Sequence, residues 1–228
     1  MNAPSVIAHR GLHDGLPENS LGAVAAALDA RADAVEIDVH ATSDGVVVVH
    51  HDFSLPRARG GPIPLAAIRL DDLSQWPLAD GTSIPRLSDV LTLAAGRGHI
   101  HVEIKGRNIE SQVMECLASS TCAASVHSFD HRIVKRCAEL NGSVPRGILL
   151  ESYLVDSIGA LRSAAANDLW QYFELIDDAL VSEVHRAGGK VIAWTVNDPD
   201  DALRLALAGV DGICTDNVLE VKAAVAGA

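Results

Sequence analysis

Short apolar runs alternate with longer segments of helical periodicity along most of the chain, a pattern typical of parallel strands joined by helices. Strands are predicted at Ser5–Ala8, Ala34–His40, Val46–His50, His99–Ile104, Ala124–Ser128, Arg146–Leu150, Leu169–Phe173, Val191–Thr195 and Gly212–Thr215. Helices are predicted at Glu18–Ala30, Ser88–Ala95, Ile109–Ser119, His131–Glu139, Ser157–Ala166, Ala179–Ala187, Pro199–Ala208 and Leu219–Ala226.

About eight strand–helix units in 228 residues predict a (β/α)8 barrel formed as a single domain over residues 1–228. A doubly wound sheet would also alternate, but it usually carries a glycine-rich turn after its first strand, and here His9-Arg10-Gly11 follows instead. The Asp44-Gly45 turn predicts a hairpin. Residues 53–86 are rich in Pro, Gly and Arg, which indicates a short loop-rich insertion with one helix near Leu70–Ser74.

The composition of the chain argues against several classes of function. The net charge is −12 and lysine and arginine do not cluster, so a nucleic-acid partner is not expected. The sequence has no uncharged apolar stretch of the roughly 18 residues that cross a membrane and no signal-peptide pattern, so we expect no integral membrane segment and a cytoplasmic location. The four cysteines show no CxxC spacing. No pattern predicts an oligomeric state.

Two carboxylates occupy one face of the second predicted strand, AVEIDVH. If Val35, Ile37 and Val39 pack against helices, Glu36 and Asp38 face the barrel interior. Glu103 repeats the pattern in HVEIK on the next barrel strand. Three converging carboxylates repel one another and are costly to bury, and a divalent cation that prefers oxygen ligands, Mg²⁺ or Ca²⁺, removes both penalties. Buried salt bridges with Arg10 or Lys105 are the alternative interpretation.

Histidines follow strands at the end where barrel active sites lie. His9 and His51 are candidate general acid and base, because imidazole titrates near neutral pH. Alternation directs only one of His50 and His51 inward, and His51 is our hypothesis because the neighbouring Asp52 can orient its ring. Arg10 offers bidentate donors to phosphate oxygens. The remaining histidines considered are interpreted as ordinary ones: His13, His127, His131 and His185.

Several motifs together resemble the glycerophosphodiester phosphodiesterase family. They are IAHRG (Ile7–Gly11), PENS (Pro17–Ser20), EIDVHATSDGVVVVHHD (Glu36–Asp52), IPRLSDVL (Ile84–Leu91), VEIKG (Val102–Gly106), AWTVND (Ala193–Asp198) and GVDGICTD (Gly209–Asp216). The set HRG…PEN…E-x-D…HD is highly specific, and the pieces span nearly the whole chain. PENS stands where the family more often has PENT, and the family's Arg-Thr-Thr-like run after HD is here Pro56-Arg57-Ala58-Arg59.

The resemblance implies a (β/α)8 barrel that hydrolyses glycerophosphodiesters to sn-glycerol 3-phosphate and an alcohol. It implies that His9 and His51 are the acid/base pair. It also implies that Glu36, Asp38 and Glu103 hold the divalent cation, that Arg10 and Lys105 contact phosphate, and that Trp194 lines the glycerol end. Three alternatives remain: a lysophospholipase D-type enzyme, a non-catalytic phosphodiester-binding barrel, and another metal-dependent barrel enzyme with Lys105 as its base.

Overall fold

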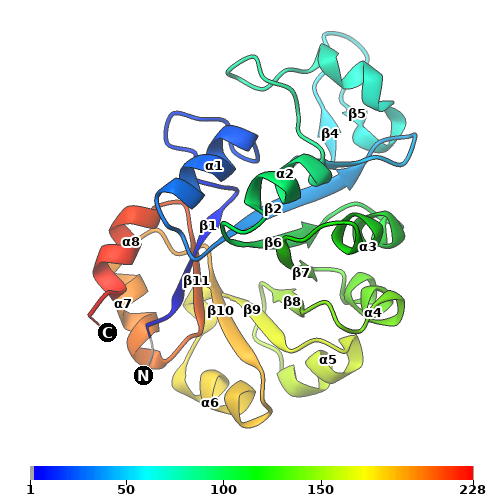
Figure 1. The fold of residues 1–228 in the computed structure, drawn as a ribbon. Helices are drawn as coiled ribbons and strands as arrows, with labels where there is room; N and C mark the ends of the chain where they lie inside the picture. The colour runs from blue at the N-terminus through cyan, green and yellow to red at the C-terminus, as the bar shows by residue number, and fades with distance from the viewer. Residues whose placement is uncertain (1–2, 228) are drawn as a thin grey trace.

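The predicted barrel is confirmed in a computed structural model, which describes residues 3–227 (Figure 1). Its eight parallel strands are β1 (Ser5–His9), β2 (Ala34–Ala41), β6 (His99–Ile104), β7 (Ala123–Ser128), β8 (Arg146–Leu150), β9 (Asp168–Tyr172), β10 (Lys190–Trp194) and β11 (Gly212–Thr215). Strand β1 pairs with both β2 and β11, which closes the barrel. All eight carboxyl ends therefore meet at one end of the barrel.

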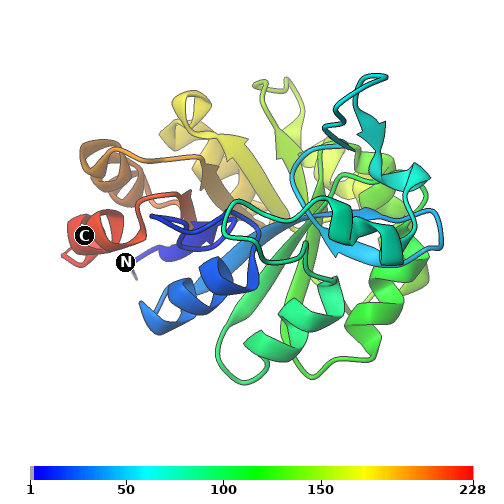
Figure 2. The same ribbon diagram turned by 90° about the horizontal axis from the view of Figure 1, so that it is seen from above.

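Helices surround the strands in both views (Figures 1 and 2). They are α1 (Leu21–Asp29), α2 (Leu87–Ala94), α3 (Glu110–Ala118), α4 (His131–Leu140), α5 (Ser157–Ala164), α6 (Asp178–Arg186), α7 (Pro199–Ala208) and α8 (Val218–Val225). Within residues 3–227, no helix is both long enough and apolar enough to cross a membrane.

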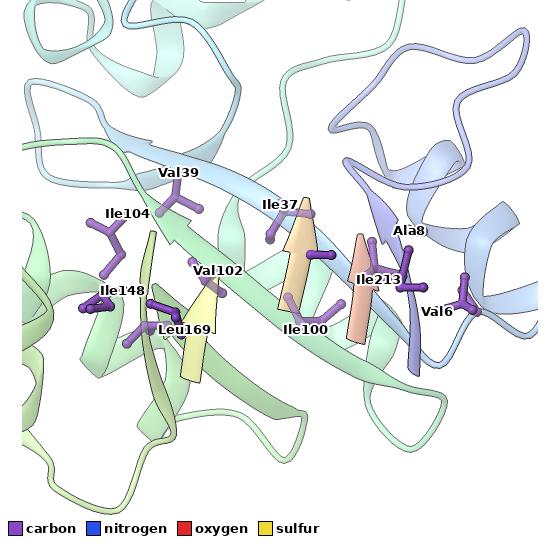
Figure 3. Close-up of a cluster of buried hydrophobic side chains, with 14 of the residues drawn as sticks. Val6, Ala8, Ile37, Val39, Ile100, Val102, Ile104, Ile148, Leu169 and Ile213 are labelled. Atoms are coloured by element: carbon purple, nitrogen blue, oxygen red, sulfur yellow. The ribbon is translucent and has the colours of Figure 1, made fainter. Parts of the chain in front are cut away.

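The main core lies between the strands and the helices. Alternate strand residues, such as Ile37, Val102 and Leu169, are fully buried in this layer (Figure 3). Because strand side chains alternate between faces, the residues between them point into the barrel. The apolar residues of each strand thus pack against the helices, and the residues that alternate with them line the barrel interior.

The first helix begins later than predicted. The prediction placed its start at Glu18, whereas α1 begins at Leu21 and the Ser20 side chain caps it by accepting a hydrogen bond from the Ala23 N–H. Asn19 has a positive φ of 58°, which no helical residue adopts. The reason is that Glu18 and Asn19 direct their side chains toward charged partners, Arg10 just after β1 and Asp38 on β2, described below.

Strand β3 (Val47–Val49) returns antiparallel to β2, which confirms the predicted hairpin. The insertion that follows, residues 53–86, contains more structure than predicted. The predicted short helix is present as the 3-10 helix η2 (Leu70–Gln75), preceded by η1 (Leu65–Ala67). The two-stranded sheet of β4 (Ser54–Leu55) and β5 (Ile63–Pro64) was not predicted. The insertion, cyan in Figures 1 and 2, lies at the carboxyl end of β2 and has a small apolar core of its own.

Candidate active site

A cavity of about 150 Å³ opens at the carboxyl ends of the strands, and we call it the upper cavity. It collects residues from the strand ends and from the hairpin that follows β2. Its lining is His9, Arg10, Glu36, His51, Glu103, Lys105, His127, Phe129, Leu149, Trp170, Trp194, Thr195 and Cys214. All the predicted site residues are in this set except Asp38, which lies buried beside it.

Glu36 and Glu103 approach each other inside the barrel together with His127. One possible ligand atom from each of the three residues lies within 4.8 Å of the other two. Burial, followed by the charges of Asp38 and Glu103, raises the pKa of Glu36 well above its usual value. Burial and the Asp38 charge also raise the pKa of Glu103 to about 7.

These groups fit a divalent cation. Glu36 Oε1 is buried and has no hydrogen-bond partner among residues 3–227, so its lone pairs are available. A cation would supply the missing partner and offset the repulsion between the carboxylates. The donor set therefore suits a hard or borderline divalent ion.

Asp38 is held by neighbouring side chains rather than left open. Its Oδ2 accepts a hydrogen bond from Asn19 Nδ2 at 2.9 Å and lies 3.2 Å from Arg10 Nε, and its Oδ1 lies 3.4 Å from Lys105 Nζ. Burial alone would raise its pKa, but the charges of Lys105 and Arg10 and the Asn19 hydrogen bond hold the pKa below its usual range. Asp38 is therefore an anion that orients both cations of the site.

Arg10 is positioned by a strained turn. It has a φ of 56°, and the next residue, Gly11, has a φ of 86°. A Cβ on Gly11 would lie 2.6 Å from the backbone of Ala23 in α1, so only glycine permits this close approach. Arg10 Nη1 donates to both oxygens of Glu18 at 3.0 Å. The PEN segment thus aims the guanidinium, because Glu18 holds one side of it and the Asn19–Asp38 pair the other.

His9 is oriented by a carboxylate that the sequence analysis assigned no role. His9 Nδ1 lies 2.7 Å from Asp216 Oδ1, a contact that directs an Nδ1–H at the carboxylate and fixes the orientation of the ring. Asp216 also contacts His13 Nε2 at 3.1 Å and accepts from Asn197 Nδ2 at 2.7 Å. Burial opposes ionisation, but these hydrogen bonds lower the pKa of Asp216 far below its usual value.

His51 lines the upper cavity, whereas His50 does not. His51 Nδ1 lies 2.9 Å from Asp52 Oδ1, and the His51 carbonyl lies 3.2 Å from His40 Nε2. The His50 N–H donates to the Asp38 carbonyl at 2.9 Å, which ties the hairpin's return arm to β2. The hairpin thus brings His51 back to the end of β2 where Glu36 and Asp38 lie.

Aromatic side chains form one wall of the upper cavity. The Trp194 ring lies 5.4 Å from that of Phe129 and 5.9 Å from that of Tyr172, in both cases edge to face. Trp194 Nε1 is buried with no partner among the described residues. This wall offers an apolar surface to a bound molecule.

Two histidines interpreted as ordinary do lie at the site, and two do not. His127 faces Glu36, and His13 contacts Asp216. His131 instead contacts the Leu149 carbonyl at 3.1 Å, and His185 contacts Asp211 at 2.8 Å. The signal that could have identified both His127 and Asp216 is their position at the carboxyl end of a strand.

Comparison with known proteins agrees with this geometry. The model of the glycerophosphoryl diester phosphodiesterase family matches residues 9–220. The chain is 30% identical to a glycerophosphodiester phosphodiesterase of Caldanaerobacter subterraneus, over 93% of each protein. The structure of a glycerophosphodiester phosphodiesterase from Thermotoga maritima superposes with a TM-score of 0.82 at 27% identity, covering 98% of this chain and 99% of the other.

A further solved structure carries a ligand. It is an Oleispira antarctica phosphodiesterase in complex with its product, sn-glycerol-3-phosphate, with a TM-score of 0.89 and 25% identity. The match covers 99% of this chain and 98% of that one. The chain belongs to the glycerophosphoryl diester phosphodiesterase family and is a phosphoric diester hydrolase.

Proposed function

We propose that this enzyme hydrolyses glycerophosphodiesters to sn-glycerol 3-phosphate and an alcohol, by histidine acid/base catalysis with a carboxylate-bound divalent cation. The observation that carries the proposal is the content of the upper cavity. Two histidines with carboxylate partners, two cationic side chains and two carboxylates with raised pKa values share about 150 Å³. The product bound to the Oleispira antarctica enzyme supports the glycerol phosphate half of the substrate.

Glu36, Asp38 and Glu103 would hold the cation, which these oxygen ligands lead us to expect to be Mg²⁺ or Ca²⁺. The buried, unpartnered Glu36 Oε1 supports this assignment, as does the repulsion that raises the pKa values of Glu36 and Glu103. Asp38 would complete the set through Oδ1, whose contact with Lys105 is the longest that Asp38 makes. When bound, such an ion polarises a phosphoryl oxygen and lowers the barrier to attack on phosphorus.

His9 would act as the general base and His51 as the general acid. The Nδ1 proton of His9 is directed at Asp216, so the Nε2 lone pair can accept a proton from the attacking hydroxyl. Asp216 would then stabilise the imidazolium that forms. His51 is partly exposed, its Nδ1 lies 2.9 Å from Asp52 Oδ1, and it would donate a proton to the leaving alkoxide.

Arg10 and Lys105 would bind the phosphate oxygens. Both side chains point toward Asp38 and line the upper cavity, so their charges are positioned before substrate arrives. Trp194, with Phe129 against its ring, would contact the glycerol carbons. Substrate thus lies between a charged wall and an aromatic one.

A second candidate substrate class is supported by one observation. Apolar side chains are exposed on loops that follow strands at the same end of the barrel, among them Phe53, Phe129 and Tyr153. Val155, beside Tyr153, is fully exposed. These groups could contact the acyl chain of a lysophospholipid, which would make the enzyme a lysophospholipase D.

One assay tests the function and separates the two substrate classes. Purified enzyme is incubated with glycerophosphocholine or lysophosphatidylcholine in Mg²⁺, Ca²⁺ or EDTA, and products are followed by ³¹P NMR. We expect sn-glycerol 3-phosphate from glycerophosphocholine, loss of turnover in EDTA, and recovery when the cation is restored. Faster release of choline from lysophosphatidylcholine would favour the second candidate. Hydrolysis of neither substrate by folded, cation-loaded enzyme would contradict both.

A further inference from the structure

One buried histidine in the upper cavity, His127, has a ring nitrogen that lacks a hydrogen-bond partner among residues 3–227. His127 lies on β7 and is 1% exposed, and the nitrogen concerned is Nδ1. Buried polar side chains are nearly always hydrogen-bonded, so an unpartnered one calls for an absent group. The buried Glu36 Oε1 across the cavity is unpartnered as well. The His127 atom that faces Glu36 is Nε2 rather than Nδ1, and a cation bound between Nε2 and Oε1 would give the unpartnered carboxylate oxygen its missing partner.

The strand register places His127 beside the predicted cation site. His127 pairs with Glu103 across β6 and β7, and Glu103 pairs with Asp38 across β2 and β6. His127 Nε2 lies 3.9 Å from Glu36 Oε1, and the three candidate ligand atoms of Glu36, Glu103 and His127 lie within 4.8 Å of one another. Small side-chain adjustments would bring all three to the roughly 2.0–2.2 Å of direct ligation.

The ring is also held in place. It stacks on Trp170 with centroids 4.1 Å apart and an angle of 6° between the planes, and Trp170 is 2% exposed. Turning the imidazole away from Glu36 would break this stack inside a close-packed barrel. His127 is therefore a rigid nitrogen donor rather than a mobile side chain that happens to be near.

We propose that His127 is a ligand of the divalent cation and that its nitrogen gives the site a preference for first-row transition ions that carboxylates alone would not provide. This inference rests on the cation site of the proposed function and refines it. Imidazole suits ions such as Zn²⁺ and Co²⁺, whereas oxygen ligands suit Mg²⁺ and Ca²⁺. Removing the nitrogen therefore affects the two classes of ion unequally.

The test measures cation binding without substrate. Apoprotein prepared with EDTA and then dialysed is titrated calorimetrically with Co²⁺ and with Mg²⁺, and visible absorption reports the Co²⁺ environment. The variant is His127→Phe, which keeps a ring to stack on Trp170 but has no nitrogen. We expect its Co²⁺ affinity to fall about tenfold or more and its Mg²⁺ affinity to change less than about threefold, with altered Co²⁺ absorption.

A matched control separates ligation from packing. His101 also contacts Trp170, with centroids 5.0 Å apart, but its Nδ1 is hydrogen-bonded to Ser125. His101→Phe should leave both affinities within about twofold. His127→Ser provides a smaller second variant, and thermal unfolding of each apoprotein checks folding.

Three results would overturn the proposal. They are equal losses of Co²⁺ and Mg²⁺ affinity in His127→Phe, unchanged affinities in both His127 variants, and a wild-type protein that binds neither ion. Because no turnover is measured, the outcome is independent of the hydrolysis assay. An enzyme that fails to hydrolyse glycerophosphodiesters but shows the selective loss of Co²⁺ would contradict the proposed substrate and support the ligand.

Discussion

The two ends of the barrel interior are built from the same strands but differ in chemistry. Strand β6 contributes Glu103 to the upper cavity and His99 and His101 to the opposite end. There a second cavity of about 270 Å³, which we call the lower cavity, is lined by Ser5, Ile7, Asp33, Ala34, His99, His101, Ser125, Pro145, Asp168, Lys190, Ile192, Asp211 and Gly212. Both cavities therefore contain histidines, carboxylates and a lysine.

The difference lies in how the polar groups are partnered. In the lower cavity, Ser125 Oγ bridges His99 Nε2 at 3.0 Å and His101 Nδ1 at 2.7 Å. Burial lowers the pKa values of both histidines, so they remain neutral near pH 7. In the upper cavity, Glu36 and His127 have buried atoms without partners, and carboxylates crowd together. The residue types at the two ends are alike, so they do not identify a functional site. Buried polar atoms without hydrogen-bond partners and carboxylates that repel one another do identify one.

The largest expected effect is on catalysis. His9→Ala and His51→Ala should each lower kcat for glycerophosphocholine by about 10³-fold or more, because each removes one of the two proposed proton-transfer groups. His99→Gln, in the lower cavity, should change kcat less than about threefold. Steady-state kinetics on proteins with matched circular dichroism spectra provide the measurement. Full activity in His51→Ala would refute the assignment, and an inactive His99→Gln would remove the contrast between the two ends.

The carboxylates that orient the two histidines should differ in their effect. Asp216 receives three hydrogen bonds and is half-buried, whereas Asp52 is largely exposed and contacts His51. Asp216→Asn should lower kcat about 10²-fold, since His9 loses the carboxylate that fixes its tautomer. Asp52→Asn should cost about tenfold. A larger loss in Asp52→Asn than in Asp216→Asn would reverse the proposed order of importance.

Cation binding should stabilise the folded protein, and this effect should depend on residues of the upper cavity and not on those of the lower cavity. At a free Mg²⁺ concentration of about 100 times Kd, the free energy of unfolding should rise by about 2.7 kcal/mol, which thermal unfolding detects as a higher Tm. Glu36→Gln should abolish this increase, and it should raise the Tm of the apoprotein because a repelling buried charge is removed. Asp168→Asn in the lower cavity should keep the full increase. Loss of the Mg²⁺ effect in Asp168→Asn would place the ion elsewhere.

Much of this architecture could be predicted because strand alternation is local. The sequence places Glu36 and Asp38 on one face of β2 whatever the rest of the chain does, and the confirmed barrel turns that face inward. The Asp44-Gly45 turn likewise predicts the hairpin that returns His51 to the upper cavity. Such features depend only on residues a few positions apart.

Long-range pairing could not be predicted in the same way. Asp216 contacts His9 across 207 positions of sequence, and no local pattern says which carboxylate orients which histidine. The late start of α1 has the same origin, because Glu18 and Asn19 leave the helical pattern to bind Arg10 and Asp38. His127 resembles any buried strand histidine until the register places it beside Glu103. These details require the closed barrel.

The smallest effect concerns the stability of the lower cavity. Burial raises the pKa of Asp168 to about 6, although Lys190 opposes the shift and Asp211 adds to it. The unfolded chain has a value near 3.9. The folded state therefore binds the proton more tightly, and the stability that this adds below about pH 4 is lost as the pH rises to about 6.

Asp168→Asn removes this titration. Relative to wild type, the variant should gain about 1–2 kcal/mol of unfolding free energy between pH 4 and pH 7, as measured by urea denaturation at both values. The unfolding free energy of Lys190→Met should depend on pH more steeply than that of wild type, because the lysine holds the Asp168 pKa down. Parallel pH profiles for wild type and Asp168→Asn would show that the lower cavity tolerates the ionised carboxylate. Burial alone would then not explain the raised pKa values of Glu36 and Glu103 in the upper cavity.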